Sequence, residues 1–353
     1  MRTWLQHRLA DQQLTMLIAS LFGIFVLLAL LGKVLAPLLM AVALAYVLEG
    51  VVALFCRCRL PRLLAITLVG SGAMVIVFFS LIALLPLLTE QVGNLIAHVP
   101  EYLSATRDSL KALQVSYASW INPVAIQQLI ASGASKMQEW GAAVLSFSIS
   151  SIPGIITLLV YMVLVPVLIF FLLKDKEEIV AWSEQFLPRE RTLLVRVWHE
   201  LDLQIGNYIR GRFWESLAVG VTMWLLFHFM HHQYALLLAV LTAISVWIPF
   251  VGAAVVAIPV LLLSFFQWSW SDTTFYALGA YALVQLIDAN ILIPWIFSEM
   301  VNLHPIAIIV AVLLFGSVGG LLGVFFAIPL AALVQSVLGI IIERANESQK
   351  PVI

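Results

Sequence analysis

Charged residues are scarce in this chain. Asp, Glu, Lys and Arg together make up 10% of the 353 residues, whereas hydrophobic residues make up 63%, and the mean hydropathy is +1.06. This composition excludes an ordinary soluble domain and predicts an all-α, polytopic membrane protein, with the lipid bilayer as its surroundings. The net charge of −1 gives no reason to expect a nucleic-acid partner.

The signatures of common enzyme classes are absent as well. His199-Glu200 is not followed by the second histidine of a zinc-protease helix, and the sequence has no G-x-S-x-G and no phosphate loop ending in Gly-Lys-Ser or Gly-Lys-Thr. We therefore predict no enzymatic activity, no catalytic residue and no cofactor. ATP hydrolysis within this chain is not expected.

Potential metal ligands are few. The only cysteines, Cys56 and Cys58, stand among arginines in a segment expected to face the cytoplasm, where both thiols would stay reduced. His228, His231 and His232 have helical spacing, but no carboxylate lies beside them in the sequence. No metal site is predicted from these residues.

Long apolar runs are abundant, and six of them are long enough to cross a bilayer. They are Leu14–Leu31, Val34–Phe55, Leu63–Leu88, Ile152–Leu173, Phe213–Met230 and Phe275–Phe297. With the N-terminus inside, fourteen Lys and Arg residues face the cytoplasm and four lie outside, which together are the 18 of the chain. The four are Lys33, Arg107, Lys111 and Lys136. We therefore expect a bacterial cytoplasmic (inner) membrane protein with both termini in the cytoplasm.

Two further apolar stretches resemble each other. A-V-L at 239–241 is followed by P-F-V-G at 249–252 and A-I-P at 257–259, and A-V-L at 311–313 is followed by G-S-V-G-G at 316–320 and A-I-P at 327–329. The arms are shorter than the roughly 20 residues that cross hydrocarbon. We predict re-entrant helical hairpins at 235–266 and 304–340, inverted with respect to each other around the span at 275–297. Two kinked but complete crossings are the alternative.

Two segments break the apolar pattern. Residues 89–151 are amphipathic, with helix breaks expected at Pro100 and Pro123, and predict a helical layer on the outer (periplasmic) surface. Residues 174–212 carry dense charge and predict a cytoplasmic amphipathic helix on the inner leaflet or a neighbouring subunit. Its apolar face comprises Leu194, Trp198, Leu201, Ile205 and Tyr208.

These segments define the expected organisation of the chain. Residues 1–88 hold three spans, 89–151 the outer segment, 152–173 the fourth span, 174–212 the cytoplasmic segment, 213–345 a transport core with both hairpins, and 346–353 a cytoplasmic tail.

Asp288 is the strongest candidate for a functional side chain. It lies halfway along an otherwise apolar span, where an ionised carboxylate costs roughly 2.5–3.5 kcal/mol. Gln285 is one helical turn earlier on nearly the same face, whereas Asn290 lies about 160° away around the helix. We predict a polar cluster facing the hairpin tips, with protonated Asp288 in a packing role as the alternative.

The hairpin tips provide the other candidates for binding a substrate or an ion. Free amides at the start of each returning arm favour anions, and free carbonyls at the end of each arriving arm favour cations. The tip residues are Pro249, Gly252, Gly316, Ser317, Gly319 and Gly320. Glycines in membrane helices also serve close packing, so both interpretations stay open for the second tip. For Glu49 and Glu215 we expect structural pairing with Arg57 or Arg212.

Taken together, several motifs resemble the autoinducer-2 exporter (AI-2E) family of bacterial membrane proteins, and within it a branch of permeases. They are L-A-Y-V-L-E at 44–49, F-F-L-L-K-D-K at 170–176, N-Y-I-R-G at 207–211, I-P-F-V-G at 248–252, D-A-N at 288–290, N-L-H-P at 302–305 and F-F-A-I-P-L at 325–330. The resemblance implies an inner-membrane transporter that forms a homo-oligomer. For some relatives it implies export of the quorum-sensing signal autoinducer-2 or exchange of sodium or lithium for protons.

Three functions are compatible with the sequence. The first is a secondary transporter that exports a small polar metabolite such as autoinducer-2. The second is a Na⁺(Li⁺)/H⁺ antiporter that uses Asp288 as its coupling carboxylate. The third is a membrane scaffold that does not transport, with its two amphipathic segments as docking surfaces; that function leaves the intramembrane position of Asp288 unexplained.

Overall fold

The structure, a computed structural model, describes residues 12–116, 152–185, 192–249, 251–297 and 304–347, together with Gln128, Ser132 and Ser135. The regular structure within these ranges is entirely helical, which confirms the predicted all-α class of a polytopic membrane protein. Four predicted features lie outside the described residues: the break at Pro123, most of the outer segment beyond residue 116, the N-L motif at 302–303 and the tail beyond residue 347.

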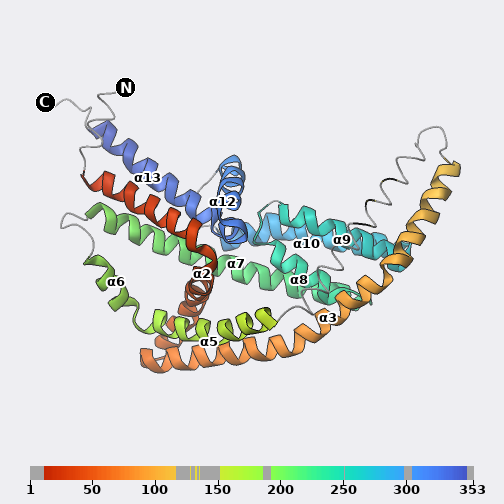
Figure 1. The fold of residues 1–353 in the computed structure, drawn as a ribbon, viewed down its shortest axis with the longest axis horizontal. Helices are drawn as coiled ribbons and strands as arrows, with labels where there is room; N and C mark the ends of the chain where they lie inside the picture. Colours follow the sequence, from red (N-terminus) through yellow and green to blue (C-terminus); the bar gives the residue numbers. More distant parts are fainter. Residues whose placement is uncertain are drawn as a thin grey trace.

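The N-terminal helices are longer than the predicted spans. Helix α2 (Gln12–Arg57) contains the first two predicted spans, and the loop expected between them near Lys33 is absent. Figure 1 shows that α2 changes direction sharply partway along its length, and Pro37 lies inside it. A proline within a helix removes a backbone hydrogen bond and bends the axis, which accounts for a bend without a loop.

Helix α3 (Arg62–Ser116) forms a long arc below the other helices in Figure 1. It passes through Pro86 and Pro100, so the break expected at Pro100 was wrong: the helix continues across both prolines. Many apolar side chains on its first half are exposed, among them Ile76 and Phe79. These side chains present an apolar surface of the kind that contacts lipid.

Helices α5 (Ile152–Lys174) and α6 (Lys176–Glu184) follow, and then α7 (Thr192–Phe229). Helix α5 matches the fourth predicted span. Helix α7 joins the predicted amphipathic helix to the span at 213–230 without interruption, and its 38 residues extend about 57 Å. The apolar side chains of Leu201, Ile205 and Tyr208 pack within the chain, because α7 lies against α2. This part of the predicted amphipathic face is therefore covered without a lipid surface or a second subunit.

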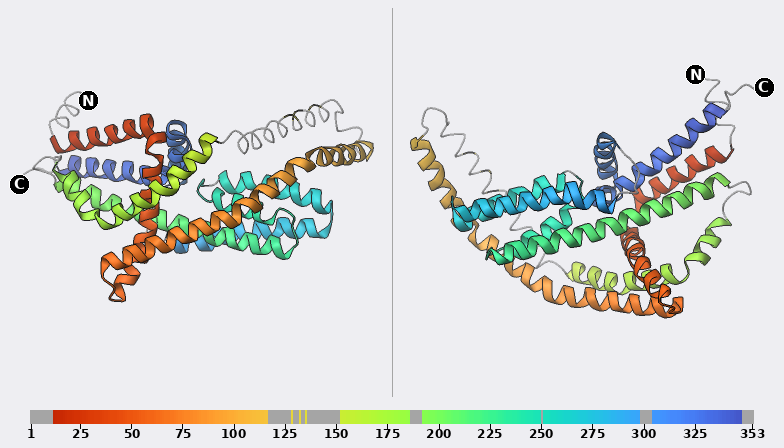
Figure 2. Two further views of the ribbon diagram at one scale, coloured as in Figure 1. Left: turned by 60° about the horizontal axis from the view of Figure 1, so that its bottom comes forward. Right: turned by 180° about the vertical axis from the view of Figure 1, so that it is seen from behind.

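The first predicted hairpin is formed by α8 (Ala235–Ser245) and α9 (Val251–Trp268), which lie side by side in Figures 1 and 2. With 11 residues, α8 is about 17 Å long, too short to cross a ~30 Å hydrocarbon core. With 18 residues, α9 is longer than the predicted arm and long enough to span.

The sixth predicted span consists of α10 (Asp272–Ile287), the π-helical turn η1 (Asp288–Leu292) and α11 (Ile293–Ile296). The second hairpin region consists of α12 (Pro305–Phe325) and α13 (Ala327–Glu347). Helix α12 is interrupted at Gly320, which has φ 57° and ψ −138°. Because only glycine adopts that conformation readily, Gly320 is where the second tip turns.

Length and apolar composition mark four segments of the described chain as able to cross a membrane. They are Val34–Arg57, Arg62–Tyr102, Val251–Trp268 and Asp272–Ile296. Shorter apolar helices occur at Val160–Lys174, Ala235–Ser245, Pro305–Gly320 and Ala327–Ser336. The main core lies where α7, the first hairpin and α10 pack together, around Met223, Phe227, Leu238, Val260 and Ala277.

Candidate functional site

Asp288 lies where the α-helix of α10 widens into the π-helical turn η1. Its side chain is buried, with 7% exposure, as the sequence predicted for a carboxylate inside a span. Among the described residues its Oδ1 atom has no hydrogen-bond partner. A π-turn in the middle of a helix frequently marks a functional site, because it re-aims side chains at the expense of regular hydrogen bonding.

Arg212 and Glu215 form a buried ion pair on α7. The Arg212 Nη1 atom donates to both carboxylate oxygens of Glu215, at 2.8 and 2.9 Å. The guanidinium also lies over the rings of Tyr208 and Phe297, at 5.6 and 5.1 Å from their centroids. The pairing expected for Glu215 is therefore present, and both charges are removed from solvent.

Glu49, the other acidic residue expected to form a structural pair, bonds a different arginine from the one named. Its Oε1 accepts from Arg62 Nη2 at 3.1 Å, so the expected Arg57 is replaced by Arg62 at the start of α3. The pair is partly exposed, which suits a position at the end of the spans.

Asp288 is close enough to the ion pair to interact electrostatically with both Arg212 and Glu215. When both acids are ionised, two carboxylates face one guanidinium, and the cluster carries one excess negative charge. Two buried polar atoms of this cluster have no hydrogen-bond partner within the described chain, Arg212 Nε and Asp288 Oδ1, and the same holds for Gln285 Nε2, one helical turn before Asp288. Buried polar atoms are rarely left without partners, so these donors and acceptors are available to a solute, an ion or water.

Asn290 and Ser317 do not join this cluster. The Asn290 amide is exposed and donates to the Leu286 carbonyl at 2.8 Å, one turn back on its own helix. The Ser317 hydroxyl is likewise exposed and donates to the Leu314 carbonyl at 2.8 Å. Of the predicted polar site residues, the structure therefore places Asp288 near the ion pair of α7, with Gln285 one turn earlier on α10, and leaves Asn290 and Ser317 exposed.

The predicted tip glycines have different surroundings. Gly252 is buried against α8, where an added Cβ would overlap the carbonyl group of Ser245. Gly323 stands in the same relation to Phe315 in the second hairpin. Gly319 and Gly320 are exposed with open space around them, and Pro249 and Gly316 are partly buried. In both hairpins the arms approach so closely that one of them must lack a side chain.

The first hairpin contacts both α10 and the second hairpin. Tyr281 OH donates to the Ala253 carbonyl at 2.6 Å, which fixes the start of α9 against α10 two turns before Asp288. Trp247 in the first tip stacks on Phe325 at the end of α12. Phe325 belongs to the same apolar cluster as Tyr208 and Phe297, the two rings beneath Arg212. The tips and the charged cluster are therefore linked through aromatic contacts.

The other end of α7 carries a separate buried polar network. The His232 Nδ1 atom accepts from the Tyr234 amide at 3.1 Å, and its Nε2 atom lies 3.4 Å from Ser264 Oγ. Burial lowers the pKa of His232 to about 4. Tyr234 also shares a 3.0 Å hydrogen bond with Tyr102, which ties the first hairpin to α3.

Comparison with known proteins places the chain in a family. The family model described as "AI-2E family transporter" matches residues 14–343, nearly the whole chain. The chain belongs to the AI-2E family. This confirms the resemblance drawn from the short motifs.

Several AI-2E relatives cover most of the chain. The permease PerM of Escherichia coli strain K12 is 38% identical over 335 residues, which are 95% of each chain. The transport protein YueF of Bacillus subtilis is 28% identical over 306 residues, 85% of this chain and 82% of the relative. The AI-2 transport protein TqsA of E. coli is 23% identical over 320 residues, 86% and 85% of the two chains. The names of these relatives, a permease and two transport proteins, agree with the description of the family model.

Sequence reasoning named Arg212 as a structural partner of Glu215 but did not identify it as part of the candidate site of this AI-2E protein. It counted Arg212 among the cytoplasmic charges and ended the amphipathic face at Tyr208. Yet steps of four and three residues, the spacing of a single helix face, connect the buried apolar residues to the ion pair. The residues on this face are Leu201, Ile205, Tyr208, Arg212 and Glu215. Extending that face by two further positions would have led from the buried apolar residues to the ion pair.

Proposed function

We propose that this AI-2E protein is a secondary transporter of the bacterial cytoplasmic membrane that exports a small polar metabolite, and that Asp288, Gln285, Arg212 and Glu215 contact the solute. The observation that carries the proposal is the set of unbonded donors and acceptors around a buried carboxylate at a π-helical turn. Intramembrane ionisable residues are costly and are usually functional. The proposal includes no enzymatic step and no cofactor.

The chemistry of this cluster suits a solute rich in hydroxyl groups. Asp288 Oδ1 accepts hydrogen bonds, whereas Gln285 Nε2 and Arg212 Nε donate them. A hydroxyl both donates and accepts, so the hydroxyl groups of a solute match each of these atoms. The name of TqsA, a relative that covers most of this chain, supports autoinducer-2 as the first solute to test.

The two hairpins supply a means of alternating access in this proposal. A cytoplasmic N-terminus, which the distribution of Lys and Arg favours, makes the hairpins enter from opposite faces. The tip residues Pro249, Gly252, Gly316, Ser317, Gly319 and Gly320 would then reshape around the solute, and Asn290 on its outer face would contact lipid or a neighbouring copy in a homo-oligomer. Close packing at Gly252 and the backbone turn at Gly320 support tips of defined geometry.

Efflux from proteoliposomes loaded with autoinducer-2 tests this function. The parent protein should release the solute faster than empty liposomes, and Asp288→Asn should reduce the rate at least tenfold. Asp272→Asn is the matched control, because Asp272 begins the same helix with an exposed side chain. Equal efflux from the parent and Asp288→Asn at matched incorporation would remove Asp288 from the mechanism.

A second function, exchange of Na⁺ or Li⁺ for protons, is favoured by the charge of the cluster. Two carboxylates beside one guanidinium leave an excess negative charge that one proton or one monovalent cation neutralises in turn. Proton flux in proteoliposomes challenged with Na⁺, Li⁺ or K⁺ separates this function from metabolite export. Cation-dependent flux that disappears in Asp288→Asn would establish the antiporter, and metabolite efflux without such flux would exclude it.

A further inference from the structure

Two aromatic rings lie close to the buried Arg212 guanidinium. The guanidinium carbon stands over the Phe297 ring, 5.1 Å from its centroid, and over the Tyr208 ring at 5.6 Å. The two centroids are 6.3 Å apart and the rings are inclined by 36°, so they form a corner beside the cation. An aromatic face attracts a cation through its quadrupole, so the rings stabilise Arg212 without providing hydrogen-bond acceptors for its N–H groups.

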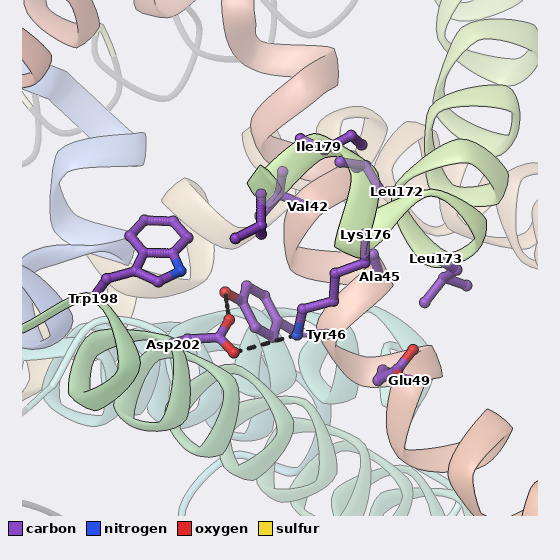
Figure 3. Close-up of a pocket in the computed structure, with 11 residues that line it drawn as sticks. Val42, Ala45, Tyr46, Glu49, Leu172, Leu173, Lys176, Ile179, Trp198 and Asp202 are labelled. Atoms are coloured by element: carbon purple, nitrogen blue, oxygen red, sulfur yellow. Dashed lines mark hydrogen bonds and ion pairs between the residues drawn. The ribbon is translucent and has the colours of Figure 1, made fainter. Parts of the chain in front are cut away.

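The hydrogen-bond donors of Arg212 are only partly used. Its Nη1 atom donates to both oxygens of Glu215, whereas Nε has no partner within the described chain. The charged network at the start of α7 differs in this respect. One oxygen of Asp202 accepts from Tyr46 OH at 2.6 Å and the other lies 3.2 Å from Lys176 Nζ, at the edge of a cavity of about 190 Å³ (Figure 3). Both oxygens of Asp202 are therefore engaged, and of these two networks it is the one at Arg212 that keeps a buried donor free.

Phe297 reaches Arg212 because the neighbouring position on α7 has no side chain. Gly211 is buried, and a Cβ atom there would lie 2.5 Å from Phe297 Cε1 and 2.8 Å from Ile296 Cγ2. Side chains do not pack that closely, so a larger residue would push the end of α11 away from α7. Gly211 is therefore the surface on which the Phe297 ring rests.

Phe297 belongs to the span that carries Asp288. Its amide donates to the Ile293 carbonyl at 2.9 Å, which fixes it to the last turn of that span. Asp288 begins η1, nine positions earlier, and is close enough to Arg212 to interact with it electrostatically. One span thus supplies both the acid near Arg212 and the ring against which the guanidinium lies.

We propose that Phe297, seated on Gly211, is a positioning residue for the solute site: its ring holds the Arg212 guanidinium beside Glu215 and leaves Nε free for the solute. This rests on the proposed function, in which Arg212 contacts the solute, and adds the residues that set the position of that cation. Phe297 acts through Arg212 and need not touch the solute. Its loss should therefore weaken solute binding rather than slow the movement of the hairpins.

Efflux from proteoliposomes loaded with increasing concentrations of autoinducer-2 tests the positioning role. Phe297→Leu keeps an apolar side chain without the ring, and should raise the half-saturating concentration about fivefold, the effect of one lost cation–π contact, at a nearly unchanged maximal rate. Phe297→Tyr keeps the aromatic face and should restore most of the affinity. Phe326→Leu is the matched control, since Phe326 packs in the same apolar cluster but is not one of the two rings described at Arg212, and should behave like the parent. An unchanged half-saturating concentration in Phe297→Leu would overturn the proposal.

Gly211→Ala tests the seat of the ring. Alone, it should raise the half-saturating concentration as Phe297→Leu does, because the methyl group displaces the ring from Arg212. Combined with Phe297→Leu it should add little, since the ring that it displaces is already absent. Fully additive effects of the two substitutions would show that Gly211 does not act through Phe297.

A measurement without transport distinguishes failure of the positioning role from failure of the proposed function. In detergent, Phe297→Leu and Arg212→Gln should be non-additive by about fivefold in the unfolding equilibrium constant, as expected for a cation–π contact. If the parent does not release autoinducer-2, the function is refuted for that solute, while non-additivity would still support the contact between ring and cation. Additive effects would overturn the positioning role whatever the solute.

Discussion

Trp247 and Phe325 stack with ring centroids 4.3 Å apart and an interplanar angle of 11°. Trp247 belongs to the first hairpin tip, and Phe325 is the last residue of α12, so 78 positions of sequence separate two rings in contact. Each ring stands beside the end of a helix, so the stack joins the first hairpin tip to the end of α12. A movement of one hairpin must therefore disturb the other.

The coupling between these rings should be measurable. We expect Trp247→Ala and Phe325→Ala to be non-additive by about 0.5–1.5 kcal/mol in a double-mutant cycle, the range for aromatic pairs. The free energy of unfolding in detergent is the quantity to compare. Trp295→Ala, at an exposed position of α11, is the control and should not couple to Phe325→Ala. Additive losses at 247 and 325 would show that the stack is not energetically important.

The close approach of the two arms depends on one glycine in each hairpin. Gly252→Ala and Gly323→Ala should each destabilise the protein by about 1–3 kcal/mol, because the new methyl group would overlap a backbone carbonyl group that cannot rotate away. Gly279→Ala in α10 meets open space and should be neutral or stabilising by up to ~1 kcal/mol. Thermal melting of the three purified variants makes the comparison, and equal melting temperatures would contradict the close approach of the arms.

Removing the Arg212 cation should lower the free energy of unfolding more than removing both Arg212 and Glu215 as charges. Arg212→Gln leaves Glu215 and Asp288 buried without a counter-charge, and we expect a loss of about 3 kcal/mol. Arg212→Gln combined with Glu215→Gln should recover part of that loss. Arg210→Gln, two residues earlier with neutral hydrogen-bond partners, is the control and should cost less. Denaturant unfolding measures all four proteins, and a double variant no better than Arg212→Gln would contradict the pairing.

The network at His232 predicts that stability depends on pH. The pKa of His232 is about 4 in the folded protein and about 6.5 when the chain is unfolded, so between these values the unfolded state binds more protons. Stability should be unaffected by this group above pH 6.5, decrease as the pH falls from 6.5 to 4 by about 3 kcal/mol, and then level off.

Melting between pH 4 and 7.5 tests the histidine prediction. Substituting His232→Asn should flatten this part of the curve, because a neutral side chain replaces the titrating ring. His231→Asn provides the matched control, since His231 is exposed, and should retain the parent's slope. A parent protein with no slope in this interval would show that His232 is freely protonated in the folded state.

Sequence reasoning predicted the helical membrane class, which the structure confirms, and singled out Asp288, which the structure buries. A carboxylate in an apolar span is conspicuous from composition alone, and the similar A-V-L and A-I-P repeats located both hairpins. The hairpin turns also followed residue chemistry, since Gly320 adopts a positive φ and Gly252 allows close contact between arms.

Other features depend on contacts that no local pattern specifies. Helix α2, which contains Pro37, bends where a loop was expected, and α3 continues through Pro100, because tertiary packing determines whether a proline ends a helix or only curves it. The proximity of Asp288 to Arg212 was missed for a similar reason. The sequence led us to expect that Arg212 pairs with Glu215, and only the fold shows that Asp288 lies near this pair.

Helix α7 runs unbroken from Thr192 to Phe229 and carries both Asp202, which accepts a hydrogen bond from Tyr46 of α2, and Arg212 at the charged cluster. Ten residues of continuous helix separate them, or about 15 Å, so neither can rotate without the other. Ser216, one turn beyond Arg212, is bonded to the Ala243 carbonyl of the first hairpin at 2.7 Å. Because no break interrupts α7 between these positions, a rotation of the helix at Asp202 is transmitted to the first hairpin through Ser216.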